Sequence, residues 1–168
     1  DVGEKRPFWT RMIVEGKTSH GSVPIGDQNP VPVLARAVGR VAAWQTPLVL
    51  SPAVERFFKA MATVETGPGK RWLADPAAAL RSPAGRAWLT SGPERNALLR
   101  NTISPTVLTG SNKTNTIPQT ASAELDIRLL PDQDPEAFRR ELIRIIADPR
   151  VRLEEISPLP PRYSAPLG

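Results

Sequence analysis

The sequence lacks cysteine altogether, which excludes disulfide bonds and metal sites built from thiolates. It contains one histidine, His20, and no acidic cluster with ligand spacing, so too few side chains converge to hold a metal ion. A glycine-rich phosphate-binding loop is also absent, because Gly67 and Gly69 only flank a proline in an isolated helix breaker. We therefore expect this chain to bind no metal ion or cofactor by itself.

Long apolar runs and blocks of like charge are absent too. No run approaches the ~20 residues of a membrane-spanning helix. The net charge is +5, but the cations are scattered, which favours a diffusely basic surface over a nucleic-acid or membrane partner. The chain starts at Asp1 with no initiator methionine and no signal-peptide pattern. We expect a piece of a longer soluble protein, and the compartment, cytoplasmic or exported, is left open.

What is present is a pattern of alternating strands and amphipathic helices over a chain that is 40% hydrophobic, enough to form a core. The clearest strand is at 119–130, where five apolar residues of one parity alternate with Ser122, Glu124, Asp126 and Arg128. The other expected elements are strands at 7–18, 102–109 and 151–156, and helices at 29–44 and between 135 and 148.

Residues 47–100 differ in character from the rest and predict a helical insertion. Ser51 followed by Pro52 is typical of a helix start, and shorter helical pieces are expected at 72–80, 83–89 and 94–99. The proline-rich residues 157–168 predict an extended tail leading to a further domain. We treat 1–168 as a single domain that contains this insertion.

Without the insertion, the element order is β-α-β-β-α-β, which predicts an α+β, ferredoxin-like fold. Two amphipathic helices would cover one face of a four-stranded antiparallel sheet. The other face would carry Glu124, Asp126 and Arg128 and stay open to water, another domain or a substrate.

His20 is the first candidate for chemistry, because imidazole donates a proton or polarises a carbonyl near neutral pH. It stands between Ser19 and Gly21 at the exit of the first expected strand. The alternative is a surface histidine with no role. A serine nucleophile paired with His20 would also need an oriented base, and the sequence supplies none.

Asn115 and Arg128 are the other two candidates. The amide of Asn115 both donates and accepts hydrogen bonds, but the same residue could simply shape the turn before a strand. The planar guanidinium of Arg128 can grip a carboxylate through two parallel bonds. Its alternative is an ion pair with Asp126 or Glu124 on the same strand face.

Two blocks of sequence resemble a known family. The first is VEGKTSHGSVP at residues 14–24, followed by Asn29-Pro30 at a helix start. The second runs from TISPTVL at 102–108 through NTIP at 115–118 into AELDIRLLP at 123–131. Together they resemble the dimerisation (lid) domain of the di-zinc metallopeptidases and amidohydrolases that include aminoacylase, carboxypeptidase and succinyl-diaminopimelate desuccinylase.

The resemblance implies a homodimer in which two lids pair and extend their sheets. It implies that two zinc ions are bound by a catalytic domain outside this chain, so that the chain alone is inactive. It also implies that His20 reaches the partner's active site to bind the scissile carbonyl, and that Asn115 and Arg128 hold the carboxylate-bearing part of the substrate. The insertion is similar to that of the larger carboxypeptidase-like lids, which favours peptide or N-acyl-amino-acid substrates. The turn at Gly110-Ser111 departs from the family's usual two glycines.

Two rival functions remain. A ferredoxin-like sheet can bind protein or RNA, but the strand at 119–130 has no aromatic residue to stack on a base. The lid of a homologue that has lost its activity would have the same sequence features. Finding the zinc ligands in the rest of the protein would decide between an active and an inactive parent.

Overall fold

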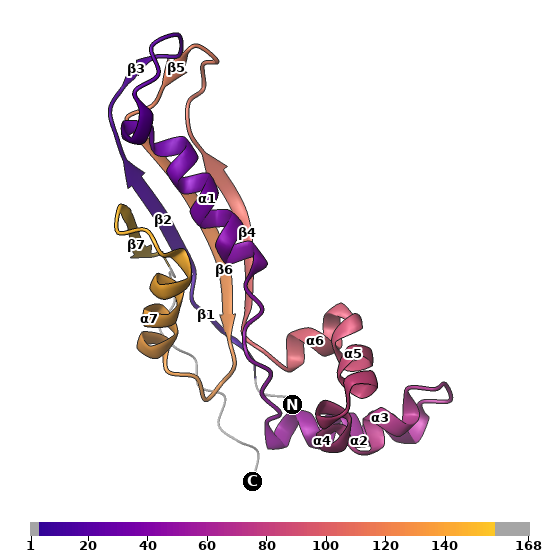
Figure 1. The fold of residues 1–168 in the computed structure, drawn as a ribbon. Helices are drawn as coiled ribbons and strands as arrows, with labels where there is room; N and C mark the ends of the chain where they lie inside the picture. The colour runs from indigo at the N-terminus through magenta and orange to yellow at the C-terminus, as the bar shows by residue number, and fades with distance from the viewer. Residues whose placement is uncertain (1–3, 157–168) are drawn as a thin grey trace. The chain divides into compact units, whose positions relative to one another are not determined.

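The computed structural model describes residues 4–156, so the expected tail at 157–168 lies outside the described residues. The chain divides into two compact units (Figure 1). One unit is Thr46–Asn101, which covers nearly the same residues as the expected insertion. The other consists, within the described residues, of Arg6–Gln45 and residues 102–156, and it contains the sheet. No helix within residues 4–156 is long and apolar enough to cross a membrane.

The main sheet is antiparallel throughout. Its strands are β1 (Arg6–Pro7), β2 (Thr10–Glu15), β4 (Thr102–Thr109), β6 (Thr120–Leu129) and β7 (Val151–Glu155). Arg6 pairs with Leu129 and Thr10 with Leu125, so β1 and β2 keep one register against β6 and act as a single interrupted strand. The spatial order is therefore β4-β6-β2-β7. This is the ferredoxin-like arrangement, and the fold prediction is confirmed.

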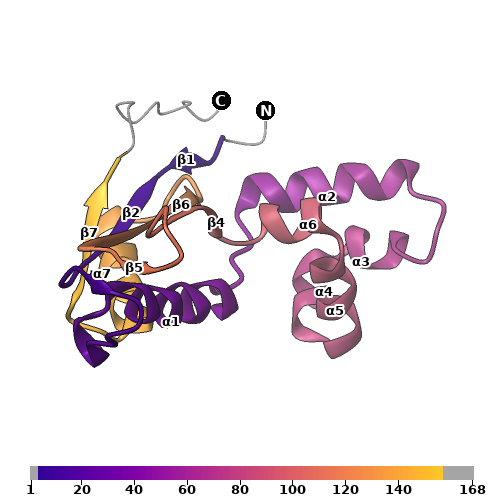
Figure 2. The same cartoon turned by 90° about the horizontal axis from the view of Figure 1, so that it is seen from above.

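Two helices, α1 (Pro30–Ala43) and α7 (Pro135–Ile146), lie on the same face of the sheet (Figure 2). Strand β6 supplies the centre of the core, because every second residue of it faces these helices and is buried. The main buried residues are Met12, Val14, Leu34, Ala37, Val41, Ala121, Ala123, Leu125, Ile127, Leu129, Phe138, Leu142 and Ile146. The opposite face of β6, from Ser122 to Arg128, is only half-buried.

Local sequence explains where both helices begin. The side chain of Asn29 accepts a hydrogen bond from the N–H of Val31 at 3.1 Å, and Asp134 accepts one from Glu136 at 2.9 Å. In each case the next residue is a proline, which has no N–H to leave unsatisfied in the first turn. Helix α1 is therefore one residue shorter at each end than the expected helix at 29–44, because Asn29 and Trp44 are its capping residues.

The expected continuous strand at 7–18 is wrong at its C-terminal end. Strand β2 stops at Glu15, because the N–H of Gly16 bonds Gln119 and the N–H of Lys17 turns to the carbonyl of Gln28, at the end of the short helix η1 (Gly26–Gln28). The chain then forms a second, two-stranded sheet of β3 (Ser19–His20) and β5 (Thr116–Ile117), which was not predicted from the sequence. Two-residue strands are too short for a periodic pattern.

The unit Thr46–Asn101 consists of helices α2 (Pro52–Val64), α3 (Lys70–Ala74), α4 (Pro76–Arg81), α5 (Pro83–Ser91) and α6 (Pro93–Leu98). Its core is made by Val54, Phe58, Ala62, Leu73, Ala79, Leu89 and Leu99. The single helical piece expected at 72–80 is wrong. Asp75 ends α3 and caps α4 by accepting a hydrogen bond from Ala78 at 2.9 Å, and Pro76 begins the new helix.

Candidate functional site

His20 and Asn115 are neighbours at one end of the sheet unit. In the small sheet, His20 pairs with Thr116, and the N–H of Gly21 donates to the carbonyl of Asn115 at 2.7 Å. A Cβ atom added to Gly21 would lie 3.3 Å from the carbonyl carbon of Asn115, so glycine allows the two segments to approach closely. Two segments that are far apart in sequence, β3 and β5, thus lie side by side at this end of the unit (Figure 1).

The His20 ring is held by the turn that follows it. Its Nδ1 lies 2.7 Å from the hydroxyl of Ser22 and 3.2 Å from the backbone N–H of Ser22. A backbone N–H can only donate, so this network assigns Nδ1 as an acceptor and places the proton of the neutral ring on Nε2. The exposed ring can therefore donate from Nε2 to a carbonyl oxygen.

The structure does not assemble a serine-histidine triad here. The hydroxyl of Ser19 donates to the carbonyl of Val23 at 3.0 Å and not to the ring. Within residues 4–156 the ring bonds only Ser22, so no carboxylate orients it as a general base. Asn115 is exposed in the turn before β5, and its side-chain oxygen lies 3.5 Å from the Thr116 hydroxyl, so its placement is compatible with both roles considered for it.

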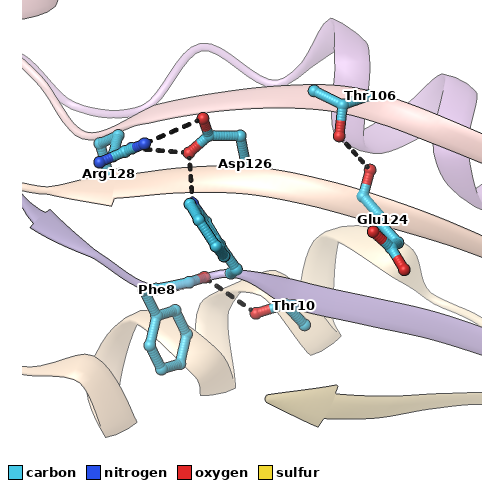
Figure 3. A network of polar contacts seen from close by, with 7 residues as sticks. Phe8, Thr10, Thr106, Glu124, Asp126 and Arg128 are labelled. Carbon is cyan, nitrogen blue, oxygen red and sulfur yellow. Dashed lines mark hydrogen bonds and ion pairs between the residues drawn. The ribbon is translucent and has the colours of Figure 1, made fainter. Parts of the chain in front are cut away.

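Arg128 is on the open face of β6 and forms an ion pair two residues away. Its Nε donates to Asp126 Oδ1 at 2.7 Å and its Nη2 to Oδ2 at 3.3 Å (Figure 3). The indole N–H of Trp9 also donates to Asp126 Oδ1, at 2.9 Å. The hydrogen bond from Arg128 is the main cause that lowers the pKa of Asp126, against the opposing effect of partial burial. The same-strand ion pair considered for Arg128 is therefore present.

The ion pair with Asp126 does not saturate the guanidinium. A guanidinium has five N–H groups, and this pair uses the one on Nε and one on Nη2. The remaining three, including both on Nη1, have no hydrogen-bond partner among residues 4–156. Since the Arg128 side chain is 39% exposed, an incoming carboxylate can reach them.

Arg128 is far from the other two candidates. It lies eight residues after Thr120 on β6, which corresponds to roughly 27 Å along an extended strand. The β3–β5 sheet with His20 and Asn115 lies beyond the Thr120 end (Figure 1). One chain therefore cannot bring all three side chains to one small substrate.

Trp9 was not among the expected site residues. It lies between β1 and β2, opposite Asp126, and the cross-strand register that places it there is not visible in a single sequence. A hollow of about 220 Å³ opens beside it, lined by Trp9, Thr106, Glu124, Leu125, Asp126 and Ile156. Nothing in the local sequence around Trp9 distinguishes it from a core aromatic residue.

No metal centre can be built from the described part of the chain. Among residues 4–156, no three histidine, aspartate or glutamate side chains gather closely enough to share an ion. The two carboxylates on the open face of β6 form ion pairs with arginines, Asp126 with Arg128 and Glu124 with Arg11. These residues do not fit a zinc site.

The peptidase dimerisation domain family (M20) matches residues 2–153. The human N-fatty-acyl-amino acid synthase/hydrolase PM20D1 is 26% identical over 166 residues, which cover 98% of this chain and 32% of the relative. The chain thus spans about a third of that protein's length.

Two solved structures share the fold. The dipeptidase Dug1p of Saccharomyces cerevisiae aligns with a TM-score of 0.59 and 16% identity, over 90% of this chain and 35% of that one. A metallo-carboxypeptidase of the M20 family from Sulfolobus solfataricus aligns with a TM-score of 0.53 and 16% identity, over 90% and 37%. The family match covers nearly the whole chain, and the element order agrees with it. This chain belongs to the dimerisation domains of M20 peptidase family hydrolases.

Proposed function

We propose that this chain is the dimerisation and substrate-binding lid of a zinc-dependent hydrolase that cleaves the amide bond of N-acyl amino acids or peptides. The zinc ions expected from the family resemblance would be held by residues outside this chain, and the chain alone would be inactive. The observation that carries the proposal is the position of His20 with Asn115 at one end of the sheet and of Arg128 toward the other.

The edge strand β4 supports a dimer contact on its side of the sheet. Leu108 on β4 is 68% exposed, and Val31 at the start of the neighbouring helix α1 is 40% exposed. The other edge strand, β7, presents Arg152, Glu154 and Glu155, and charged residues on an edge discourage pairing. An exposed edge with apolar side chains is a template for a second copy, and two-fold dimers are the commonest assemblies.

Antiparallel pairing of two β4 strands would bring Arg128 of one chain close to His20 and Asn115 of another. The two-fold axis would place the His20 end of one copy beside the Arg128 end of the other. From β6 of one copy to β6 of its partner there would be three strand spacings, or about 14 Å, compared with the roughly 27 Å along β6 within one chain. Each composite site would then combine Arg128 of one subunit with His20 and Asn115 of its partner.

The three side chains suit the two ends of an N-acyl amino acid. His20 donates from Nε2, and such a donor stabilises the oxygen of a carbonyl under attack. Arg128 offers free N–H groups to the substrate's carboxylate and so holds the amide in place. The name of the human relative refers to N-fatty-acyl amino acids, which contain both groups.

A subunit-mixing experiment with the full-length enzyme tests this arrangement. A His20→Ala subunit and an Arg128→Ala subunit should be nearly inactive as separate dimers. After exchange, each hybrid would contain one whole composite site, so a 1:1 mixture should recover about a quarter of wild-type activity.

The matched control mixes His20→Ala with Asn115→Ala. These residues lie at the same end of one chain, so every composite site in the hybrid would lack one of them and activity should stay low. Equal recovery in both mixtures, or no recovery despite demonstrated subunit exchange, would refute the composite site.

A further inference from the structure

The two edges of the Arg128 guanidinium are used differently. A guanidinium can bind one carboxylate along its side, through Nε and one Nη, and another across its end, through the two Nη atoms. Asp126 takes the side, with Nε to Oδ1 at 2.7 Å and Nη2 to Oδ2 at 3.3 Å. The end edge stays available, so the ion pair with Asp126 and the binding of a second carboxylate are compatible.

Trp9 restrains this pair from the neighbouring strand. Its indole N–H donates to Asp126 Oδ1 at 2.9 Å, so that this oxygen is shared by two donors and the carboxylate cannot turn freely. The guanidinium carbon of Arg128 also lies 5.6 Å from the centre of the Trp9 ring, within the range of a cation–π contact. The Arg128 side chain is therefore held along its side by Asp126 (Figure 3) and also lies within cation–π range of the Trp9 ring.

The ion pair of Arg128 and Asp126 is neutral overall, so a ligand is recognised mainly by the direction of its hydrogen bonds. Asp126 stays ionised because the Arg128 hydrogen bond lowers its pKa, so the two side chains together carry no net charge. Such a pair attracts anions only weakly at a distance. A ligand gains its binding energy from two correctly directed N–H groups, which suit a planar carboxylate and not a carboxamide.

The same sheet face carries a comparable ion pair without these features. Arg11 Nη2 lies 2.7 Å from Glu124 Oε1, and the Glu124 side chain is 33% exposed, close to the 36% of Asp126. Nε and Nη2 of Arg11 both donate to the same oxygen of Glu124, so this pair lacks the two parallel hydrogen bonds that join Arg128 to Asp126. Glu124 therefore provides a control carboxylate on the same strand, with the same kind of partner and a similar exposure.

We propose that Asp126 and Trp9 are positioning residues that hold Arg128 with its end edge open, and that they set the enzyme's preference for a free substrate carboxylate. The proposal rests on the proposed function, because it requires Arg128 to hold that carboxylate. Neither residue would touch the substrate. Their effect would pass entirely through Arg128, and this dependence can be measured.

The experiment compares N-acetyl-phenylalanine with N-acetyl-phenylalaninamide as substrates of the full-length enzyme. Asp126→Asn should lower kcat/KM for the free acid about tenfold, mainly through KM, and change the amide by less than about twofold. Trp9→Phe keeps an aromatic ring and loses the N–H donor, so it should cost the free acid about threefold. Glu124→Gln should leave the ratio of acid to amide unchanged.

A double-mutant cycle separates positioning from a general structural role. In an Arg128→Lys background, where the fork is already lost, Asp126→Asn should no longer change the acid-to-amide ratio. A further change there, or an equal loss for both substrates, would overturn the proposal. If wild type prefers the acid and Arg128→Lys abolishes this while Asp126→Asn retains it, only the positioning role fails. If wild type has no preference, the carboxylate role proposed for Arg128 fails as well.

Discussion

Gly16 allows a close approach that no other residue could make. A Cβ atom at this position would lie 2.2 Å from the carbonyl oxygen of Gln28 and 2.7 Å from the ring of Pro30, the first residue of α1. Its φ is not in the left-handed region, so the requirement for glycine is steric. Gly16→Ala must therefore move the start of α1 away from the end of β2, together with the segment that leads to His20.

The cost can be estimated from these contacts. Relief of the clash requires a shift of about 1 Å in packed backbone, and overpacking of this kind costs about 1–3 kcal/mol. The bond from the Lys17 N–H to Gln28, 3.0 Å long, would weaken at the same time, at a cost of about 1 kcal/mol. Alanine recovers about 0.5 kcal/mol by restricting the unfolded chain. The net loss is about 2.5 kcal/mol, or about 10–15 °C in Tm for a unit of this size.

Gly39 provides the matched control. It lies on the exposed side of α1, and a Cβ atom there would meet nothing within 4 Å. Gly39→Ala should stabilise the same unit by about 0.5–1 kcal/mol, because alanine is the better helix former. Both variants are measured by thermal unfolding, followed by circular dichroism. If Gly16→Ala raises Tm as Gly39→Ala does, the close approach at Gly16 does not exist in solution.

Two further predictions concern association and pH. Leu108→Lys places a charge on the β4 edge and should convert the dimer to monomers in sedimentation experiments. The control Glu154→Lys, on the β7 edge, should leave the dimer intact. Dimers that survive Leu108→Lys would exclude the β4 contact. The hydrogen bonds from Arg150 are the main cause that lowers the pKa of Asp148 to about 2, so this pair stabilises the fold above the ordinary aspartate pKa and loses its effect as the pH falls through about 2. Because Arg150 is exposed and solvent screens the pair, Asp148→Asn should cost about 1 kcal/mol in urea unfolding at pH 6. Most of this cost should be gone near pH 2, where about half of the Asp148 carboxyl groups are protonated. A cost independent of pH would contradict that assignment.

The elements that the sequence predicted well have strong local signals. Strand β6 alternates over its whole length, and α1 and α7 each begin with a capping residue followed by proline. The start of α4 has the same pattern, a capping residue (Asp75) followed by Pro76. The apolar residues on both sides of it nevertheless led to the prediction of one helical piece at 72–80. Helix starts are thus encoded by two or three adjacent residues, and a single sequence shows them.

The candidate site was less visible for a physical reason. That Arg128 pairs with Asp126 was foreseeable, because the two residues share one strand face. That His20 lies beside Asn115, and Trp9 opposite Asp126, depends on which strands pair and in what register. Register is set by contacts between residues about 100 positions apart, and no local pattern encodes it.

Strand β6 also limits how the chain can change in length. Eight of its residues, 120–127, separate Arg128 from the segment that carries Asn115. Insertion of one residue would turn the Arg128 side chain to the helix-covered face. Insertion of two would restore the face but move Arg128 by about 7 Å. Insertions and deletions that preserve the proposed site should therefore be confined to the connection between β4 and β5, at 110–114, and the one after β6, at 131–133, while the length of β6 stays constant among working relatives.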